Sequence, residues 1–334
     1  MLEQYSTRRE FLKYGKLSLL LLLNSCSNLS KKTTIYFQSS FYPDSLKDSF
    51  PLGWEKENIN FAEIELDKNN NKLIKTDFTL INDGWINSLN FEEFNNINSL
   101  FPSNKLDRRS KEFLKNFEDY QRNKLFPVGV VPYVVIIKNN KDLVNAANQS
   151  WDFLLSKKLT GKIIFPQSPR IIISIAKKIS GKNSLGKLKE QAMLYEDQNS
   201  LNWLINSDAC VAILPYSLCS KYFKIDSRLS TVFPKKGVPL MWHFILSKSK
   251  INTEFLIEWI KSLENKDIID KLANQGWYLP FNNIYAQSKY SPKNYGGGLI
   301  GPSNICWKNS WSFPPIVDKQ KINLDSLWNE SLTP

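Results

Sequence analysis

Short apolar runs alternate with longer polar stretches along most of the chain. Residues 34–37 and 78–81 are mainly apolar, and residues 60–66 alternate between polar and apolar positions. Runs of this length and pattern predict β-strands, and the stretches between them are long enough to form helices. Strands separated by helices are typical of parallel sheets, so the sequence predicts an α/β fold.

Two later apolar segments are longer than these strands and show little helical period. They cover residues 128–137 and 238–246, and both contain proline. The block between them has strand-like runs of its own, at residues 162–165 and 210–214. A block inserted between two long extended segments is what a two-lobed protein needs if its chain crosses twice between the lobes. The pattern therefore predicts two lobes and two crossings.

The N-terminal residues have the pattern of an export signal. Arg8 and Arg9 are followed by apolar residues, as in a twin-arginine signal, and the apolar run at residues 17–23 is only seven residues long. That run is too short to span a membrane, because a spanning helix needs about twenty residues. We therefore expect this segment to be a targeting signal rather than part of the fold.

A lipidation site follows this run. Residues 23–26 resemble a bacterial lipobox that ends in Cys26, the residue that becomes acylated in such a motif. We expect residues 1–25 to be the signal peptide and residues 26–33 to be a lipidated tether. This interpretation predicts a periplasmic protein that contacts the membrane through its N-terminal lipid. An uncleaved, amphipathic start of the chain is the alternative.

Composition narrows the classes of function. The chain has 44 lysines and arginines, 32 acidic residues, 1 histidine and 4 cysteines, with a formal charge of +12. A zinc site needs about four clustered ligands and a Ser-His-Asp triad would have to use His243, so we expect no metal and no other cofactor. The basic residues are dispersed and follow an export signal, which argues against a nucleic-acid partner. A mean hydropathy of −0.35 excludes a multi-span membrane protein.

Three cysteines remain if Cys26 is acylated. They are Cys210, Cys219 and Cys306. An oxidising compartment permits one disulfide, for which Cys210 and Cys219 are close enough in sequence, and an odd thiol. Buried free thiols are the other interpretation, and it is the one we favour.

Several short stretches carry a family resemblance when they are taken in order along the chain. These are residues 35–42, 79–85, 131–133, 151–154, 159–166, 168–170, 233–237 and 240–242. Together they resemble the periplasmic solute-binding proteins of ABC importers, and among these the spermidine/putrescine-binding branch. The resemblance extends over about residues 34–281.

This resemblance implies a type II-like periplasmic binding protein fold, in which two α/β lobes close over a solute. It implies a monomeric protein, not an enzyme, that holds a small-molecule solute and delivers it to an ABC permease in the cytoplasmic membrane. Lobe 1 is then residues 34–130 plus 248–334, lobe 2 is residues 138–238, and the hinge crossings are residues 131–137 and 239–247.

Candidate ligand-binding residues follow from strand ends and from the resemblance. Ligand sites in open α/β sheets lie beyond the carboxyl ends of strands. Each candidate also has a structural alternative: an aromatic ring packs in a core, Asp83 caps a turn, and Arg170 forms a local ion pair. The candidates are Phe41, Tyr42, Asp83, Trp85, Tyr133, Ser168, Arg170, Tyr216, Trp242 and His243.

The aromatic candidates suit an aliphatic polycation, because ring faces attract ammonium groups. The resemblance implies two acidic ligands in polyamine-binding members, one after a second-lobe strand and one on the return crossing. This sequence has Ser168, Arg170 and Ile171 at the first place and His243 at the second. Asp83 compensates for one missing acid at most. We therefore expect a weakly held polyamine or a different, less cationic solute.

Two further classes of function stay open. One is an exported enzyme of unknown reaction, and the other is a degenerate binding fold that acts as a scaffold lipoprotein. The aromatic stretch at residues 306–315 lies beyond the resemblance. It covers the first lobe or contacts a partner, and we favour the first interpretation.

Overall fold

The computed structural model describes residues 32–60, 76–102, 104–222, 226–248, 253–282, 301–316 and 318–331. The predicted export signal with Arg8 and Arg9 lies outside these described residues, as does Cys26 of the lipobox. The same holds for residues 61–66, which form most of one predicted strand.

Nine strands of the described residues are joined by hydrogen bonds. Their order is β2-β1-β3-β9-β4-β7-β5-β6, and β8 pairs with β4. The runs predicted at residues 34–37, 78–81, 162–165 and 210–214 are present as β1, β3, β5 and β7. The strands are β1 (Thr34–Phe37), β2 (Glu55–Asn58), β3 (Phe78–Asn82), β4 (Phe126–Lys138), β5 (Ile163–Phe165), β6 (Ala192–Tyr195), β7 (Val211–Pro215), β8 (Leu229–Val232) and β9 (Leu240–Ser247).

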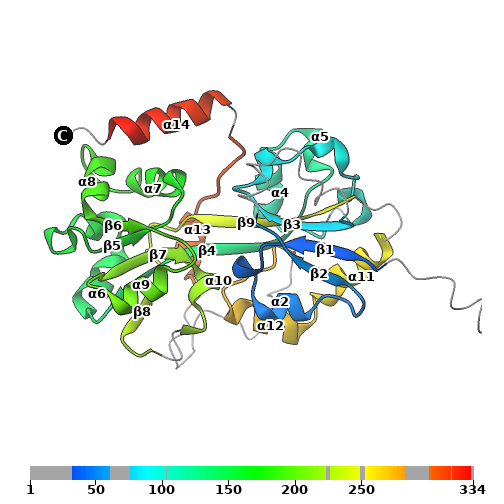
Figure 1. The fold of residues 1–334 in the computed structure, drawn as a ribbon, viewed down its shortest axis with the longest axis horizontal. Coiled ribbons are helices and arrows are strands. Elements are labelled where there is room, and N and C mark those ends of the chain that lie inside the picture. Colours follow the sequence, from blue (N-terminus) through cyan, green and yellow to red (C-terminus); the bar gives the residue numbers. More distant parts are fainter. Residues whose placement is uncertain are drawn as a thin grey trace, which may run out of the picture.

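The first lobe contains the part of this sheet that β2, β1, β3 and β9 form. Strands β2, β1 and β3 are parallel, and β9 runs antiparallel to β3. The lobe's helices surround this sheet (Figure 1). They are η1 (Ser39–Phe41), α2 (Asp44–Asp48), η3 (Ile86–Ser88), η4 (Phe91–Glu93), η5 (Asn98–Leu100), α4 (Arg108–Leu114), α5 (Asp119–Arg122), α11 (Thr253–Ser262) and α12 (Lys266–Asn274).

The second lobe contains β7, β5 and β6, which run parallel to one another, and β8. Its helices cover the other end of the molecule in Figure 1. They are α6 (Lys141–Gln149), η6 (Trp151–Leu155), η7 (Lys157–Leu159), α7 (Pro169–Ala176), α8 (Ser184–Gln191), α9 (Ser200–Asn206) and α10 (Tyr216–Cys219).

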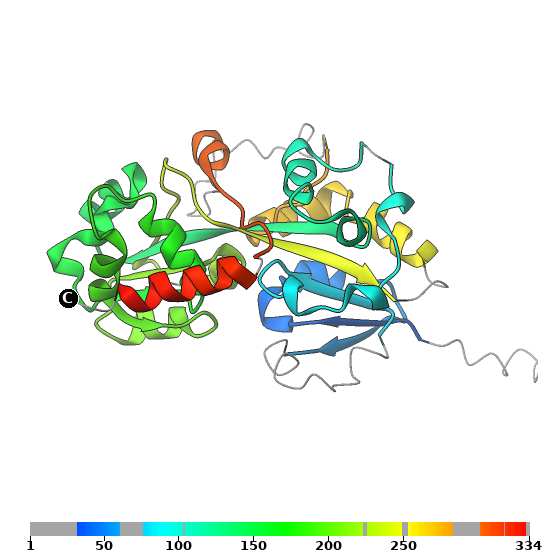
Figure 2. The ribbon, with the colours of Figure 1, turned by 90° about the horizontal axis from the view of Figure 1, so that it is seen from above.

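One long strand, β4, belongs to both lobes. It pairs with β9 over Phe126–Pro132 and with β7 over Tyr133–Ile137. The chain returns between β8, which pairs with the end of β4, and β9, which pairs with β3. Figures 1 and 2 show a lobe on either side of this junction. The predicted α/β fold with two lobes and two crossings is confirmed, and the residue boundaries between the lobes stay a prediction.

A glycine allows a tryptophan to pack against β4 near this junction. A Cβ atom on Gly129 would lie 2.1 Å from the indole ring of Trp277. The indole is fully buried, and its Nε1 donates a hydrogen bond to the carbonyl oxygen of Val128 at 3.1 Å. Glycine is therefore required at this position for the close approach of the two groups.

The C-terminal residues contact both lobes. They form α13 (Asn304–Asn309), an extended stretch and α14 (Asp318–Glu330). Arg109 of the first lobe donates to the carbonyl oxygen of Trp307, and the Trp311 ring lies 6.5 Å from the Trp151 ring of the second lobe. The favoured interpretation of residues 306–315, that they cover the first lobe, is therefore incomplete, because the stretch runs along the junction and meets both lobes.

The three described cysteines are unpaired. Cys219 and Cys306 are buried and Cys210 is half-buried. The favoured interpretation of buried free thiols is thus confirmed for Cys219 and Cys306, whereas Cys210 is a free thiol that is half-buried. Among the helices of the described residues, none combines the length and the apolar character that crossing a membrane requires.

Candidate functional site

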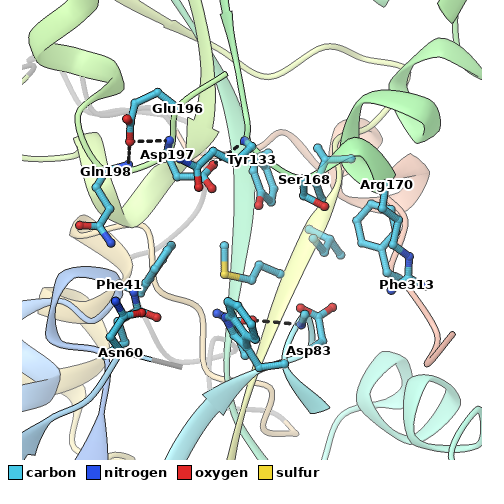
Figure 3. Close-up of a pocket in the computed structure, with 18 of the residues that line it drawn as sticks. Phe41, Asn60, Asp83, Tyr133, Ser168, Arg170, Glu196, Asp197, Gln198 and Phe313 are labelled. Carbon is cyan, nitrogen blue, oxygen red and sulfur yellow. Dashed lines mark hydrogen bonds between the residues drawn. The ribbon is translucent and has the colours of Figure 1, made fainter. Parts of the chain in front are cut away.

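A cavity of about 550 Å³ lies between the two lobes (Figure 3). Side chains of the first lobe form one wall, side chains of the second lobe form the opposite wall, and the two junction strands β4 and β9 lie between them. The lining residues are Gln38, Phe41, Asn60, Asn82, Asp83, Gly84, Trp85, Tyr133, Gln167, Ser168, Arg170, Ile171, Glu196, Asp197, Gln198, Asn199, Leu240, Met241 and Phe313.

Strand ends place the first-lobe wall. Gln38 follows β1, Phe41 ends the short helix η1, and Asp83 and Trp85 follow β3. Every residue of β3 is buried. Asp83 is the first residue after this strand, and it lines the cavity. This is the carboxyl edge of a parallel sheet, the usual place for a ligand.

Strand ends place the second-lobe wall in the same way. Ser168 lies between β5 and α7, and Arg170 is in the first turn of α7. Glu196 and Asp197 lie between β6 and α9. The two loops therefore face the first lobe from the carboxyl ends of adjacent parallel strands.

Asp83 is the acidic group of the first-lobe wall. Its Oδ2 atom is buried and has no hydrogen-bond partner in the described structure. Burial raises the pKa of Asp83 to about 7, although the positive charge of Arg170 and backbone N–H groups act in the opposite direction. A buried carboxylate oxygen without a partner is costly, so a cation in the cavity would stabilise the charged form of Asp83.

Glu196 and Asp197 form the acidic group of the second-lobe wall. One carboxylate oxygen of Glu196 accepts hydrogen bonds from the backbone N–H groups of Asp197, Gln198 and Asn199, at 3.0, 3.0 and 3.3 Å. Asp197 accepts a bond of 3.4 Å from the backbone N–H of Gln167. Burial raises the pKa of Asp197 to about 6, and the neighbouring charge of Glu196 adds to this shift.

Arg170 is the basic group of the cavity, and its guanidinium is directed to the C-terminal residues. It donates a hydrogen bond to the carbonyl oxygen of Pro314 and lies 5.0 Å from the ring centroid of Phe313. Burial lowers the pKa of Arg170, and the charge of Asp83 partly offsets this effect. The arginine stays charged, because its pKa starts far above neutrality.

Six of the ten predicted ligand-binding residues meet in this cavity. They are Phe41, Asp83, Trp85, Tyr133, Ser168 and Arg170.

Tyr42, Tyr216 and His243 lie outside the cavity. The ring of His243 is fully buried, 5.0 Å from the Tyr42 ring and 4.4 Å from the Trp277 ring. Burial lowers the pKa of His243 to about 3, so its imidazole is neutral. Tyr216 is buried against Phe233, with 5.3 Å between ring centroids. These rings lie in the protein interior. Both ring nitrogens of His243 are buried without a hydrogen-bond partner in the described structure.

Trp242 is also outside the cavity. Its ring stacks on Phe113 with 4.6 Å between centroids, and its Nε1 donates to the Ser312 hydroxyl at 2.7 Å. The preceding residue, Met241, lines the cavity. Successive side chains of a strand point to opposite faces, so Met241 and Trp242 cannot both face the ligand space.

The acidic loop of the second lobe was not predicted from the sequence. Carboxylates were expected near the positions of Ser168 and His243, whereas Glu196 and Asp197 supply them from the next loop. The signal was available, because both acids directly follow the apolar run of β6. The apolar pattern did not predict β6 as a strand, so the two acids that follow it were not predicted as part of the site. Other lining residues that were missed are Gln38, Asn60, Asn82, Gln167, Gln198, Asn199, Leu240, Met241 and Phe313.

The cavity combines carboxylates with aromatic rings. The carboxylates lie on two separate walls of a cavity that aromatic rings also line (Figure 3). In the part of the chain that the structure describes, no three His, Cys, Asp or Glu side chains are grouped so that they could hold a metal ion.

Comparisons with known proteins bear on the fold. No protein-family model and no curated protein matches the sequence. Among solved structures, the substrate-binding protein PotD of a spermidine/putrescine ABC transporter from Streptococcus pneumoniae is similar, with a TM-score of 0.64 and 12% identity. The alignment covers 90% of this chain and 98% of that one.

Binding proteins for other solutes are similar too. A periplasmic thiamin binding protein aligns with a TM-score of 0.58 and 11% identity, over 90% of this chain and 96% of that one. A ferric binding protein from Campylobacter jejuni aligns with a TM-score of 0.53 and 10% identity, over 90% and 99% of the two chains. At such low identity the likeness concerns the fold. The chain folds as the two-lobed periplasmic binding proteins do.

Proposed function

We propose that this protein is the solute-binding lipoprotein of an ABC-type importer, and that it captures a small organic cation between its lobes. The observation that carries the proposal is the charge of the cavity. Asp83, Glu196 and Asp197 line it, against one basic side chain, Arg170. That guanidinium is already engaged by Pro314 and Phe313, so the carboxylates are left to meet a ligand.

The aromatic residues support a ligand with both cationic and aliphatic parts. Phe41, Trp85 and Tyr133 line the same cavity as the carboxylates. Ring faces attract ammonium groups by about 0.5–2 kcal/mol each and cover methylene groups. A diamine or polyamine satisfies both kinds of group.

The position of the acids changes the earlier expectation about the ligand. A weakly held polyamine or a less cationic solute was expected, because Ser168, Ile171 and His243 cannot act as carboxylates. Glu196 and Asp197 supply this charge from a different loop of the second lobe. Asp83 lies on the opposite wall (Figure 3). Acids on both walls favour a ligand with two cationic ends, as in putrescine and spermidine.

The comparisons support the same class of function. The structures from Streptococcus pneumoniae and Listeria monocytogenes are both described as spermidine/putrescine ABC transporter proteins, the second as putative. The thiamin and ferric binding proteins extend the solutes of this fold to other cations. Delivery to a membrane permease is part of the proposal on these grounds.

Calorimetry on the processed protein tests the solute class. Putrescine, spermidine and thiamin are titrated in turn, with glutarate as a dianionic control of similar length to putrescine. We expect saturable binding of at least one amine and none of glutarate. Binding of glutarate without binding of any amine would overturn the proposal.

A fractionation experiment tests the anchor and the export route. We expect Cys26→Ala to release the protein from membranes and the control Cys210→Ala to leave it there. We expect the double variant Arg8→Lys and Arg9→Lys to accumulate as cytoplasmic precursor. Normal lipidated processing of the double variant would contradict the twin-arginine route.

A further inference from the structure

The extended stretch at residues 310–316 together with α14, called the C-terminal strap below, is fixed beside the return crossing at its start. The backbone N–H of Val238 donates to the Ser310 hydroxyl at 3.1 Å, and Trp311 pairs with Pro239 in a parallel bridge. The Ser312 hydroxyl accepts the bond from Trp242 described above. The strap therefore leaves the junction at a defined position, directly beside the cavity.

The far end of the strap is fixed on the second lobe. Helix α14 packs on α7 (Figures 1 and 2). Lys189 of α8 donates to the carbonyl oxygen of Trp328 and lies 3.9 Å from its ring centroid, and the Tyr195 ring lies 5.6 Å from the same ring. In between, Asn87 of the first lobe donates to the carbonyl oxygen of Ile316 at 2.7 Å. Contacts at both ends thus hold the middle of the strap across the two lobes.

The middle of the strap holds Arg170. Phe313 is buried, lines the cavity and places its ring under the guanidinium. The carbonyl oxygen of Pro314 accepts a hydrogen bond from the same guanidinium. A cation–π contact and a hydrogen bond together satisfy an arginine without a carboxylate.

Asp83 is the carboxylate that Arg170 would otherwise meet. The two groups interact electrostatically. Among the ion pairs of the described residues none joins them, and Asp83 Oδ2 has no hydrogen-bond partner. Opposite charges attract strongly where water is excluded. A guanidinium that is released from the strap can therefore turn to Asp83 and neutralise it.

We infer that the C-terminal strap determines the charge selectivity of the cavity by holding Arg170 away from Asp83. The inference rests on the proposed function, since it assumes that the cavity takes a cation. With the strap in place, Asp83 is available to a ligand ammonium group. With the strap displaced, an internal pair of Arg170 and Asp83 takes the place of the ligand. Phe313 and Pro314 then act as specificity-determining residues from outside the two-lobed core.

The test measures the ionisation of Asp83 in the ligand-free protein, by carbon NMR of labelled aspartate with Asp83→Asn for assignment. We expect Phe313→Ala to lower the pKa of Asp83 by about one unit or more, because the released guanidinium approaches it. We expect no such fall in the double variant Phe313→Ala with Arg170→Met. An unchanged pKa in Phe313→Ala, or an equal fall in the double variant, would overturn the inference.

A second variant loosens the strap without touching the cavity. Trp328→Ala removes the outer anchor, and we expect a fall of the Asp83 pKa in the same direction. Leu327→Ala, on an exposed position of the same helix, is the matched control and should change nothing. Equal behaviour of these two variants would contradict a role for the anchor.

Putrescine binding by the same variants separates this inference from the proposed function. We expect affinity to fall about tenfold or more in Phe313→Ala. We expect part of this loss to be recovered in the double variant Phe313→Ala with Arg170→Met, which has no guanidinium to pair with Asp83. If the unmodified protein binds no amine, the proposed function fails, while the ionisation of Asp83 still decides whether the strap holds Arg170. If putrescine binds Phe313→Ala and the unmodified protein equally, the proposed function stands and the inference fails.

Discussion

The two walls of the cavity present carboxylates in different states. On the first-lobe wall, Asp83 is half-buried, its Oδ2 atom is buried without a hydrogen-bond partner, and its pKa is raised to about 7. On the second-lobe wall, Glu196 accepts three backbone N–H bonds that fix the turn before α9. Asp197 lies on this turn, with its pKa raised to about 6.

This difference indicates that the carboxylates of the two walls contribute to ligand binding in different ways. The second-lobe acids are held in position by the backbone before any ligand arrives, so little ordering is needed there. Asp83 is the group whose charge is least satisfied without a ligand. We therefore expect ligand binding to depend most on Asp83 and the geometry of the cavity to depend most on Glu196.

The largest effect is expected from Asp83→Asn. It removes a charge-assisted hydrogen bond worth about 1.5–3 kcal/mol, so putrescine affinity should fall by about tenfold to a hundredfold at pH 7.5. Calorimetry provides the measurement, and Asn82→Ala, on the neighbouring lining residue, provides a control without loss of charge. Nanomolar affinity that survives Asp83→Asn would show that the first-lobe acid is not the main ligand.

Acidification should weaken binding by a comparable factor. A cation binds the ionised carboxylates, and protons compete for Asp83 below pH 7 and for Asp197 below pH 6. Affinity should therefore fall up to tenfold per pH unit below 7, or about thirtyfold by pH 5.5 from Asp83 alone. In Asp83→Asn the fall should begin near pH 6 instead. A pH-independent affinity between 5.5 and 8 would count against both carboxylates.

The same carboxyl links the stability of the ligand-free protein to pH. The folded-state pKa of Asp83, about 7, lies above its ordinary value of 3.8, so the folded protein binds this proton more tightly than the unfolded chain does. The contribution of Asp83 is therefore greatest below pH 4 and is lost as the pH rises to 7. Denaturant unfolding of the protein and of Asp83→Asn isolates this contribution as their difference, which should change in that direction.

A smaller loss of affinity is expected from Asp197→Asn. The second-lobe wall keeps the charge of Glu196, so we expect putrescine affinity to fall about tenfold rather than a hundredfold. Gln198→Ala, the next residue on the same turn, is the matched control and should change affinity little. A loss larger than that of Asp83→Asn would reverse the ranking of the two walls.

The smallest effect on binding, and a measurable one on stability, is expected at Glu196. Glu196→Gln keeps an oxygen that accepts the three N–H bonds, whereas Glu196→Ala leaves them without a side-chain acceptor. Glu196→Ala should lower the free energy of unfolding by about 1 kcal/mol, and Glu196→Gln by a few tenths. Equal unfolding midpoints for the two variants would show that the turn does not depend on this acceptor.

Much of the fold could be predicted from apolar runs. Strands β1, β3, β5 and β7 lie within one residue of their predicted ends, because each is a short run whose residues are all buried except the first of β1. Strand β2 (Glu55–Asn58) was not predicted, since all four of its residues are exposed at the edge of the sheet. Backbone pairing with β1 holds β2 in the sheet, and this pairing requires no apolar pattern in the sequence of β2.

Most of the candidate site that could be predicted lies in the loop or the first helical turn after a recognised strand, and Tyr133, inside β4, is the exception. Asp83 and Trp85 after β3, and Ser168 and Arg170 after β5, meet this condition and line the cavity. Trp242 lies within a strand, where alternation turns it away.

The sequence by itself determined the α/β class, the two lobes and the two crossings, because burial of apolar strands is a local property of the chain. Only the tertiary structure decided that Glu196 and Asp197 face Asp83 across a cavity, and that Phe313 comes to lie under Arg170. These groups are far apart in sequence, and their meeting depends on how the lobes and the C-terminal strap pack. Charge in the cavity is therefore a property of the assembled fold, since no single segment of the chain carries it.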